Sequence, residues 1–218
     1  MGKFRLQGQA FRFKDFMGIL RDLLPNNYYH IINRGNNSQD IFLHKKDYLR
    51  FLYYLEKYSG KFLTTILAYC LMPTHIHLLL KEGTETSISE FMHALNTAYT
   101  MYFNLRHSRS GHVFEGPFRD VLVKTDEYLV HVSRYIHLNP SSAGIVKKPQ
   151  DYHWSSYRHY LELAKMVFID EEPILSYFSK KDPVRDYREF VESRIDYQRE
   201  INLQKLFLES KLDSKAWP

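Results

Sequence analysis

The sequence is poor in cysteine and has no long apolar segment. It contains one cysteine, Cys70, in 218 residues, which excludes an intrachain disulfide framework and a zinc site built from several cysteines. No apolar run approaches the ~20 residues that a membrane-spanning helix needs. The first residues also lack the apolar region of a secretion signal. We therefore expect a cytoplasmic protein with no membrane partner.

Positive charge and aromatic side chains are both plentiful. The formal net charge is +5, and the chain has 17 tyrosines and 15 phenylalanines. Cations that meet phosphates and rings that stack on unpaired bases are typical of proteins that bind single-stranded nucleic acid. Many basic proteins bind no nucleic acid, so composition alone leaves both interpretations open.

Two histidines alternate in the most strand-like segment of the chain, residues 75–80, which begins after a Pro73-Thr74 turn. Because successive strand side chains point to opposite faces, His75 and His77 share one face. The other face is wholly apolar: Ile76, Leu78 and Leu80. Two imidazoles side by side can bind one metal ion. With 11 histidines in the chain, such a triplet also arises by chance, and two merely hydrogen-bonded histidines are the alternative.

The predicted elements alternate between strands and helices in an order typical of α+β proteins. Periodicity, capping residues and turn residues predict strands over 28–33, 61–72, 75–80 and 119–124, and helices over 45–60, 87–104 and 126–139. Pro140 should end the last of these helices at Asn139. This order predicts a ferredoxin-like antiparallel sheet with packed helices. We expect an N-terminal arm (1–26), this core (27–160) and a helical C-terminal extension (161–218).

Two polar, cation-bearing segments are candidates for contact with single-stranded DNA. One is the turn after the first strand, and the other is the loop-rich stretch 106–119, in which arginines and phenylalanines are interleaved. Guanidinium groups bind phosphates, and phenyl rings stack on bases. The candidate residues are Arg34, Asn36, Arg106, Arg109, Phe118 and Arg119. The alternative is an ordinary turn and a basic surface loop anchored by its phenylalanines.

The helix predicted over 126–139 carries a phenol and a carboxamide at its end. Tyr135 and Asn139 are four residues apart, so their side chains lie on the same helical face. His137, two residues after Tyr135, points elsewhere.

Several of these segments together resemble the HUH single-strand endonucleases, and among them the single-tyrosine transposases of the REP-associated group. The matching stretches span roughly residues 27–160: 29–37, Pro73 to His77, 118–119, 126–129, Tyr135 to Pro140, and 154–157. The resemblance implies that Tyr135 is the nucleophile and that His75 and His77 bind Mg²⁺ or Mn²⁺. Asn139 is the implied third ligand; related insertion-sequence enzymes have Gln there.

That resemblance implies a metal-dependent enzyme that nicks and transfers single-stranded DNA beside imperfect hairpins such as REP elements. The intermediate would be a 5′-phosphotyrosine, and a homodimer is possible. A phenol suits the chemistry, because the phosphotyrosine ester retains the energy of the broken bond for rejoining. The alternative from another class is a non-catalytic or domesticated nucleic-acid-binding protein on the same fold. A rolling-circle initiator or relaxase shares the chemistry, but no helicase or primase domain is recognisable.

Overall fold

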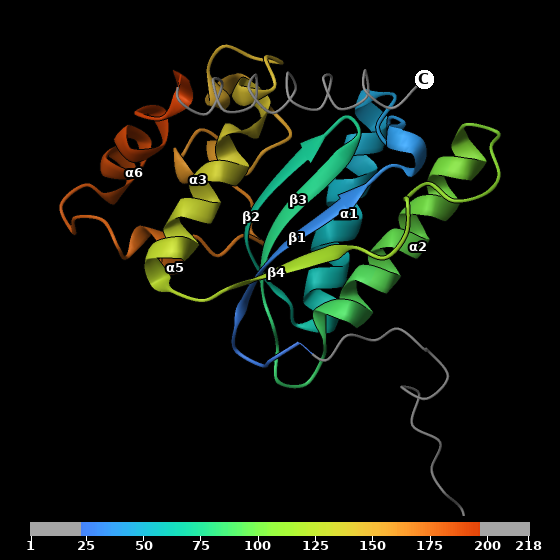
Figure 1. Ribbon diagram of the computed structural model, residues 1–218, viewed down its shortest axis with the longest axis horizontal. Coiled ribbons are helices and arrows are strands. Elements are labelled where there is room, and N and C mark those ends of the chain that lie inside the picture. The colour runs from blue at the N-terminus through green and yellow to red at the C-terminus, as the bar shows by residue number, and fades with distance from the viewer. Residues whose placement is uncertain (1–22, 197–218) are drawn as a thin grey trace, which may run out of the picture.

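The computed structural model describes residues 23–196, which form one four-stranded antiparallel sheet covered by helices (Figure 1). The expected N-terminal arm lies outside the described residues except for 23–26. The end of the C-terminal extension, 197–218, also lies outside them.

The order of the core elements confirms the α+β prediction. Along the chain they are β1 (Tyr28–Arg34), α1 (Lys45–Phe62), β2 (Thr65–Met72), β3 (His75–Lys81), α2 (Ile88–Arg106), β4 (Arg119–Val123) and α3 (Asp126–Ser142). The strands lie in the order β2-β3-β1-β4, and every neighbouring pair is antiparallel. This arrangement is a ferredoxin-like sheet, in which β3 lies between β1 and β2.

Helices cover both faces of the sheet. In Figure 1, α1 and α2 lie on one side of the strands, and α3 lies on the other side together with the segments that follow it. Nearly all residues of β2 and β3 are consequently buried. The outer edge of β2 is also covered, since the Leu71 N–H donates to the Trp154 carbonyl and the Ser156 N–H donates to the Tyr69 carbonyl. The sheet therefore has no open edge at β2.

Local sequence signals set several of these boundaries. Ser87 and Glu90 form the expected capping box at the start of α2, and Thr125 accepts from the Tyr128 N–H at the start of α3. β2 and β3 form the expected hairpin around Pro73-Thr74.

Two predicted helix ends were wrong. Helix α3 continues through Pro140 to Ser142 although the ring removes one N–H donor. Beyond it the Ala143 N–H still donates to the Asn139 carbonyl, and every residue from Ile136 to Ser142 is buried. Helix α1 runs past Ser59-Gly60 and ends at Phe62, where Leu63 adopts a left-handed conformation with φ of 49°. Gly60 remains helical in an open position, with no atom near where a Cβ would lie.

The segment after α3 is integrated into the core. It contains short helical segments over Pro149–Asp151, α4 (Tyr157–Tyr160) and α5 (Glu172–Leu175), and then α6 (Pro183–Glu192). Asp182 caps α6, as expected, by accepting from the Arg185 N–H. The side chains of Ile174, Tyr187 and Val191 are fully buried in the common hydrophobic core. Residues 161–196 therefore complete the layer that contains α3, and α6 buries one of its faces there.

Candidate active site

The register of the sheet places two histidines and two arginines on one face. Arg34 of β1 is paired with His75 of β3, and Ile32 of β1 is paired with His77. On its other side, Ile32 is paired with Arg119 of β4. Residues paired across an antiparallel sheet project to the same face. The four polar side chains consequently gather near one end of the sheet, on the side covered by α3.

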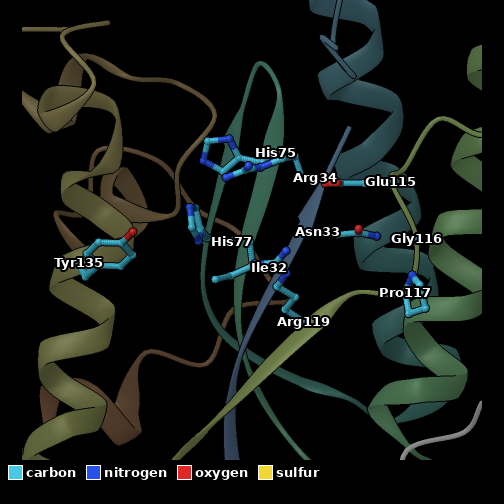
Figure 2. Close-up of a pocket in the computed structure, with 10 residues that line it drawn as sticks. All are labelled: Ile32, Asn33, Arg34, His75, His77, Glu115, Gly116, Pro117, Arg119 and Tyr135. Atoms are coloured by element: carbon cyan, nitrogen blue, oxygen red, sulfur yellow. The ribbon is translucent and has the colours of Figure 1, made fainter. Parts of the chain in front are cut away.

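Helix α3 brings Tyr135 to this group. The centroid of its ring lies 5.7 Å from that of His77 and 5.9 Å from that of His30, a third histidine that projects from β1. The rings of His75 and His77 are 4.9 Å apart. Figure 2 shows the phenol pointing from the helix toward the two β3 histidines. The structure thus brings together residues that are about 60 positions apart in the sequence.

These side chains line a cavity of about 370 Å³ (Figure 2). Its remaining wall comes from the loop before β4. The lining residues are Ile32, Asn33, Arg34, His75, His77, Glu115, Gly116, Pro117, Arg119 and Tyr135. The cavity combines two potential metal ligands, a phenol and two cationic side chains. Such groups can bind a phosphodiester and supply a nucleophile to attack it.

Each β3 histidine is held through its Nδ1 atom. The Nδ1 atom of His75 lies 3.0 Å from the Thr74 hydroxyl, and that of His77 lies 3.0 Å from Nε2 of His30. The Nε2 atom of His77 is buried without a hydrogen-bond partner among the described residues. A buried imidazole nitrogen without a partner is suited to accept a metal ion. Both rings can therefore offer Nε2 to one cation.

Burial and positive charge keep the histidines neutral at physiological pH. Burial lowers the pKa of His75 to about 4, and the nearby Arg34 guanidinium adds to this effect. The pKa of His77 falls well below its ordinary value, first through burial and then through His30, His75 and Arg34. Neutral imidazole is the form that binds metals.

The phenol of Tyr135 is expected to be protonated in the free protein. Burial raises its pKa, while a side-chain hydrogen bond with Asn139 opposes the shift. Asn139 lies one turn farther along α3, is largely buried, and donates from Nδ2 to the Tyr135 carbonyl 2.9 Å away. It adjoins Tyr135 but is not among the residues that line the cavity.

The histidine pair fits a divalent cation that takes its other ligands from oxygen atoms. Within residues 23–196, no group of three or more histidine, cysteine, aspartate or glutamate side chains could hold a metal ion. The remaining coordination positions of a cation at Nε2 of His75 and His77 would consequently be filled by a carboxamide, water or a substrate oxygen. Mg²⁺ and Mn²⁺ accept such oxygen ligands.

The structure separates the candidate DNA-contacting residues into two groups. Arg34 and Arg119 line the cavity. The other candidates lie elsewhere: Asn36 begins a short 3-10 helix, Arg106 is 3.4 Å from the buried Asp47 carboxylate, and Arg109 donates to Gln39. Phe118 is only 8% exposed and belongs to the hydrophobic core, so its ring is not presented for stacking on a base.

Sequence reasoning missed His30 as a site residue, and it included Glu115 to Pro117 only as part of the candidate stretch 106–119. His30 shares the alternation of Ile32 and Arg34, which places the three on one strand face. This alternation shows that the three side chains share a face, but it does not show which strand lies next to β1. Only the pairing of β1 with β3 reveals that His30 lies diagonally next to His77.

Comparison with known proteins gives the family. The model of the IS200-like transposase family matches residues 24–139, just over half of the chain. The chain belongs to the IS200-like transposases. The match ends at Asn139 and includes the cavity residues contributed by all four elements, β1, β3, β4 and α3. No curated protein matches this IS200-like transposase.

One solved structure shares the fold. A REP-associated tyrosine transposase bound to a REP hairpin superimposes with a TM-score of 0.58 and 14% identity, covering 70% of this chain and 96% of that chain. At that identity the likeness shows the fold alone, and it confirms the expected fold of the REP-associated group. A second structure, described as a candidate transposase from Deinococcus radiodurans, gives a TM-score of 0.40 at 18% identity over 54% of this chain and 94% of that one.

Among the described residues, no helix is long and apolar enough to span a membrane.

Proposed function

We propose that this IS200-like transposase cuts and rejoins single-stranded DNA with Tyr135 as its nucleophile. His75 and His77 would hold Mg²⁺ or Mn²⁺ in the cavity, and the side-chain oxygen of Asn139, which adjoins Tyr135 outside the cavity lining, would be the third protein ligand. One observation carries the proposal: the phenol of Tyr135 and both imidazoles line the same cavity, with the ring of Tyr135 5.7 Å from that of His77. Two arginines, Arg34 and Arg119, line the cavity beside them.

The proposed reaction is a transesterification at phosphorus. The Tyr135 oxygen forms a bond to phosphorus while the bond from phosphorus to the 3′ oxygen breaks. The phenol proton ends on the departing 3′ oxygen, directly or through water. The products are a 5′-phosphotyrosine and a free 3′-hydroxyl, and attack by another 3′-hydroxyl in the reverse sense joins a new strand and releases the phenol.

The side chains around the cavity divide the remaining tasks. A bound divalent cation supplies Lewis acidity, which neutralises charge on the scissile phosphate. Arg34 and Arg119 bind phosphate oxygens and thereby orient the strand. Asn139 lowers the pKa of the Tyr135 phenol against the effect of burial, while its amide nitrogen donates to the Tyr135 carbonyl. His137 is a poor candidate for the general base, because it points away from the cavity and is fully buried.

The proposed substrate is single-stranded DNA next to an imperfect hairpin, as in repetitive extragenic palindromes. Support comes from the fold, which the chain shares with a REP-associated transposase solved on a REP hairpin. Tyr135, His75 and His77 of one chain line one cavity, so the proposal works in a monomer and does not require a homodimer. The enzyme would act on the chromosome, in the cytoplasm at the nucleoid.

A nicking assay on denaturing gels tests the proposal. Wild-type protein is incubated with Mg²⁺ and single-stranded oligonucleotides that carry a hairpin and flanking bases of varied sequence. We expect cleavage and a protein–DNA adduct that survives denaturation. Tyr135→Phe should lose both products and still bind DNA. Tyr128→Phe is the matched control, since Tyr128 lies in the first turn of the same helix and is 44% exposed. Binding without cleavage by the wild-type protein, across the oligonucleotide set, would instead identify a non-catalytic binder.

A further inference from the structure

His30 contacts the one proposed metal ligand whose outward-facing nitrogen is buried and unpartnered. Its Nε2 atom lies 3.0 Å from Nδ1 of His77, and the two rings stack with their centroids 5.1 Å apart and 27° between their planes. Both side chains are nearly inaccessible, at 6% and 3% exposure. The contact is enclosed, so water does not compete for it.

The contact has two possible proton arrangements. In the first, His77 carries its proton on Nδ1, donates it to His30, and leaves a lone pair on Nε2. In the second, His30 donates, and His77 carries its proton on Nε2, where no described group accepts it. A buried N–H without an acceptor is rarer in proteins than an acceptor without a donor. The first arrangement is therefore favoured, and it is also the only one in which Nε2 of His77 can bind a metal ion.

We propose that His30 is a positioning residue that fixes the metal-binding tautomer of His77. His30 accepts from Nδ1 of His77 and so keeps the lone pair on Nε2 directed into the cavity. The Thr74 hydroxyl has the corresponding place at His75, where it lies 3.0 Å from Nδ1. This role rests on the proposed function, because it assumes a cation at His77. The position of the proton on His77 in the metal-free protein can nevertheless be measured independently of that function. Partners of this kind tune metal affinity from outside the ligand set.

His30 is also placed to orient the nucleophile relative to the metal ligand. Its ring meets that of Tyr135 edge-on, with centroids 5.9 Å apart and 71° between the planes. The side chain of His30 therefore lies against both His77 and Tyr135. A substitution at this position that keeps its volume but removes the acceptor would test the hydrogen bond apart from the packing.

The direct test reads the proton position by nuclear magnetic resonance. In the full-length, metal-free protein labelled with ¹⁵N in histidine, long-range ¹H–¹⁵N correlation spectra distinguish an imidazole protonated on Nδ1 from one protonated on Nε2. Near pH 7.5 we expect His77 to carry its proton on Nδ1. A proton on Nε2 of His77 would overturn the proposal, and this measurement needs no variant at His30.

Metal titration of two variants provides the second test. Mn²⁺ is added to the protein alone, and the free ion is followed by electron paramagnetic resonance. We expect His30→Phe to weaken Mn²⁺ binding about 10- to 100-fold. His30→Gln, whose side-chain oxygen can accept from Nδ1 of His77, should recover affinity to within about 3-fold of wild type. His153→Phe, at an exposed histidine outside the cavity, is the control.

The outcomes separate this proposal from the proposed function. Wild-type affinity in His30→Phe would overturn the positioning role. Equal losses in the Phe and Gln variants would also overturn it, since packing alone would then explain them. If the wild-type protein binds Mn²⁺ as expected but forms no DNA adduct, the proposed function fails while the role of His30 stands.

Discussion

The hydroxyl of Tyr187 lies 2.7 Å from Nδ1 of His137 and so joins helix α6 to the helix that carries Tyr135. Nε2 of His137 lies 2.8 Å from the Ser156 hydroxyl, which in turn accepts from the Tyr69 N–H of β2. All these side chains are fully buried. The network fixes α3 between the sheet and the C-terminal segment, on the side of the helix away from the cavity.

Removal of the Tyr187 hydroxyl should destabilise the protein. The Tyr187 hydroxyl donates to the Ser133 hydroxyl and is also the hydrogen-bond partner of His137 Nδ1. Tyr187→Phe leaves both of these buried groups without that partner, and such a loss costs about 1–3 kcal/mol of unfolding free energy. Urea unfolding measures the change. Tyr53→Phe, at a half-exposed tyrosine of α1, is the matched control and should change stability by less than about 0.5 kcal/mol. Equal effects of the two substitutions would show that the network does not stabilise α3.

Stability should decrease as the pH falls below about 6.5. Burial lowers the pKa of His137 from 6.5 to about 3. The unfolded chain therefore takes up this proton near pH 6.5, whereas the folded chain resists it until about pH 3. The stabilising contribution is complete above pH 6.5 and decreases between these values, by about 1.4 kcal/mol per pH unit for this histidine.

The matched comparison for this pH effect is His137→Gln against His153→Gln. Urea unfolding is repeated between pH 7.5 and 5. In His137→Gln the dependence of unfolding free energy on pH should be shallower by about 1.4 kcal/mol per pH unit, because the titrating group is gone. His153→Gln should keep the wild-type pH dependence. An unchanged slope in His137→Gln would mean that His137 is not the buried neutral imidazole that the contacts indicate.

Loss of the metal ligands should abolish cleavage without abolishing DNA binding. His75→Ala and His77→Ala each remove a nitrogen from the proposed cation site, and we expect cleavage to fall at least about 100-fold, in line with the several kcal/mol that metal catalysis supplies. Chelation by EDTA should have the same effect on the wild-type protein, and added Mg²⁺ or Mn²⁺ should reverse it. Cleavage that persists in EDTA would contradict the assigned cofactor.

The two cavity arginines should contribute to affinity through phosphate contacts. Arg34→Ala and Arg119→Ala are each expected to weaken binding of single-stranded DNA and to reduce the slope of log K against log salt by about 0.7. Lys57→Ala is the control, since it removes the same charge from an exposed position on α1, on the opposite side of the sheet. If Lys57→Ala reduces the slope equally, net charge and not the cavity governs binding.

Periodicity and turn chemistry predicted the core because they are local. Alternation after Pro73-Thr74 placed His75 and His77 on one face of a strand, and the spacing of Tyr135 and Asn139 placed them on one face of a helix. Their meeting in one cavity came from the family resemblance, since no local pattern relates a strand to a helix 60 residues away. His30 was missed for the same reason, because its contact with His77 depends on strand pairing.

Local chemistry also misled where packing decides. Pro140 normally disfavours a helix, but α3 continues through it in a fully buried setting. Phe118 follows a basic loop, which suggests an exposed ring, yet it lies in the core. Arg106 was a candidate for phosphate, but it is next to the Asp47 carboxylate, a partner from α1 that the sequence around Arg106 does not indicate.

The most direct test of the account is to identify the residue that becomes joined to DNA. Wild-type protein is reacted with a cleavable single-stranded oligonucleotide, digested with protease and nuclease, and analysed by mass spectrometry. The account predicts a nucleotide on the phenolic oxygen of Tyr135, attached through a 5′-phosphate, and no such peptide from Tyr135→Phe. An adduct on another residue, or cleavage without any adduct, would contradict it.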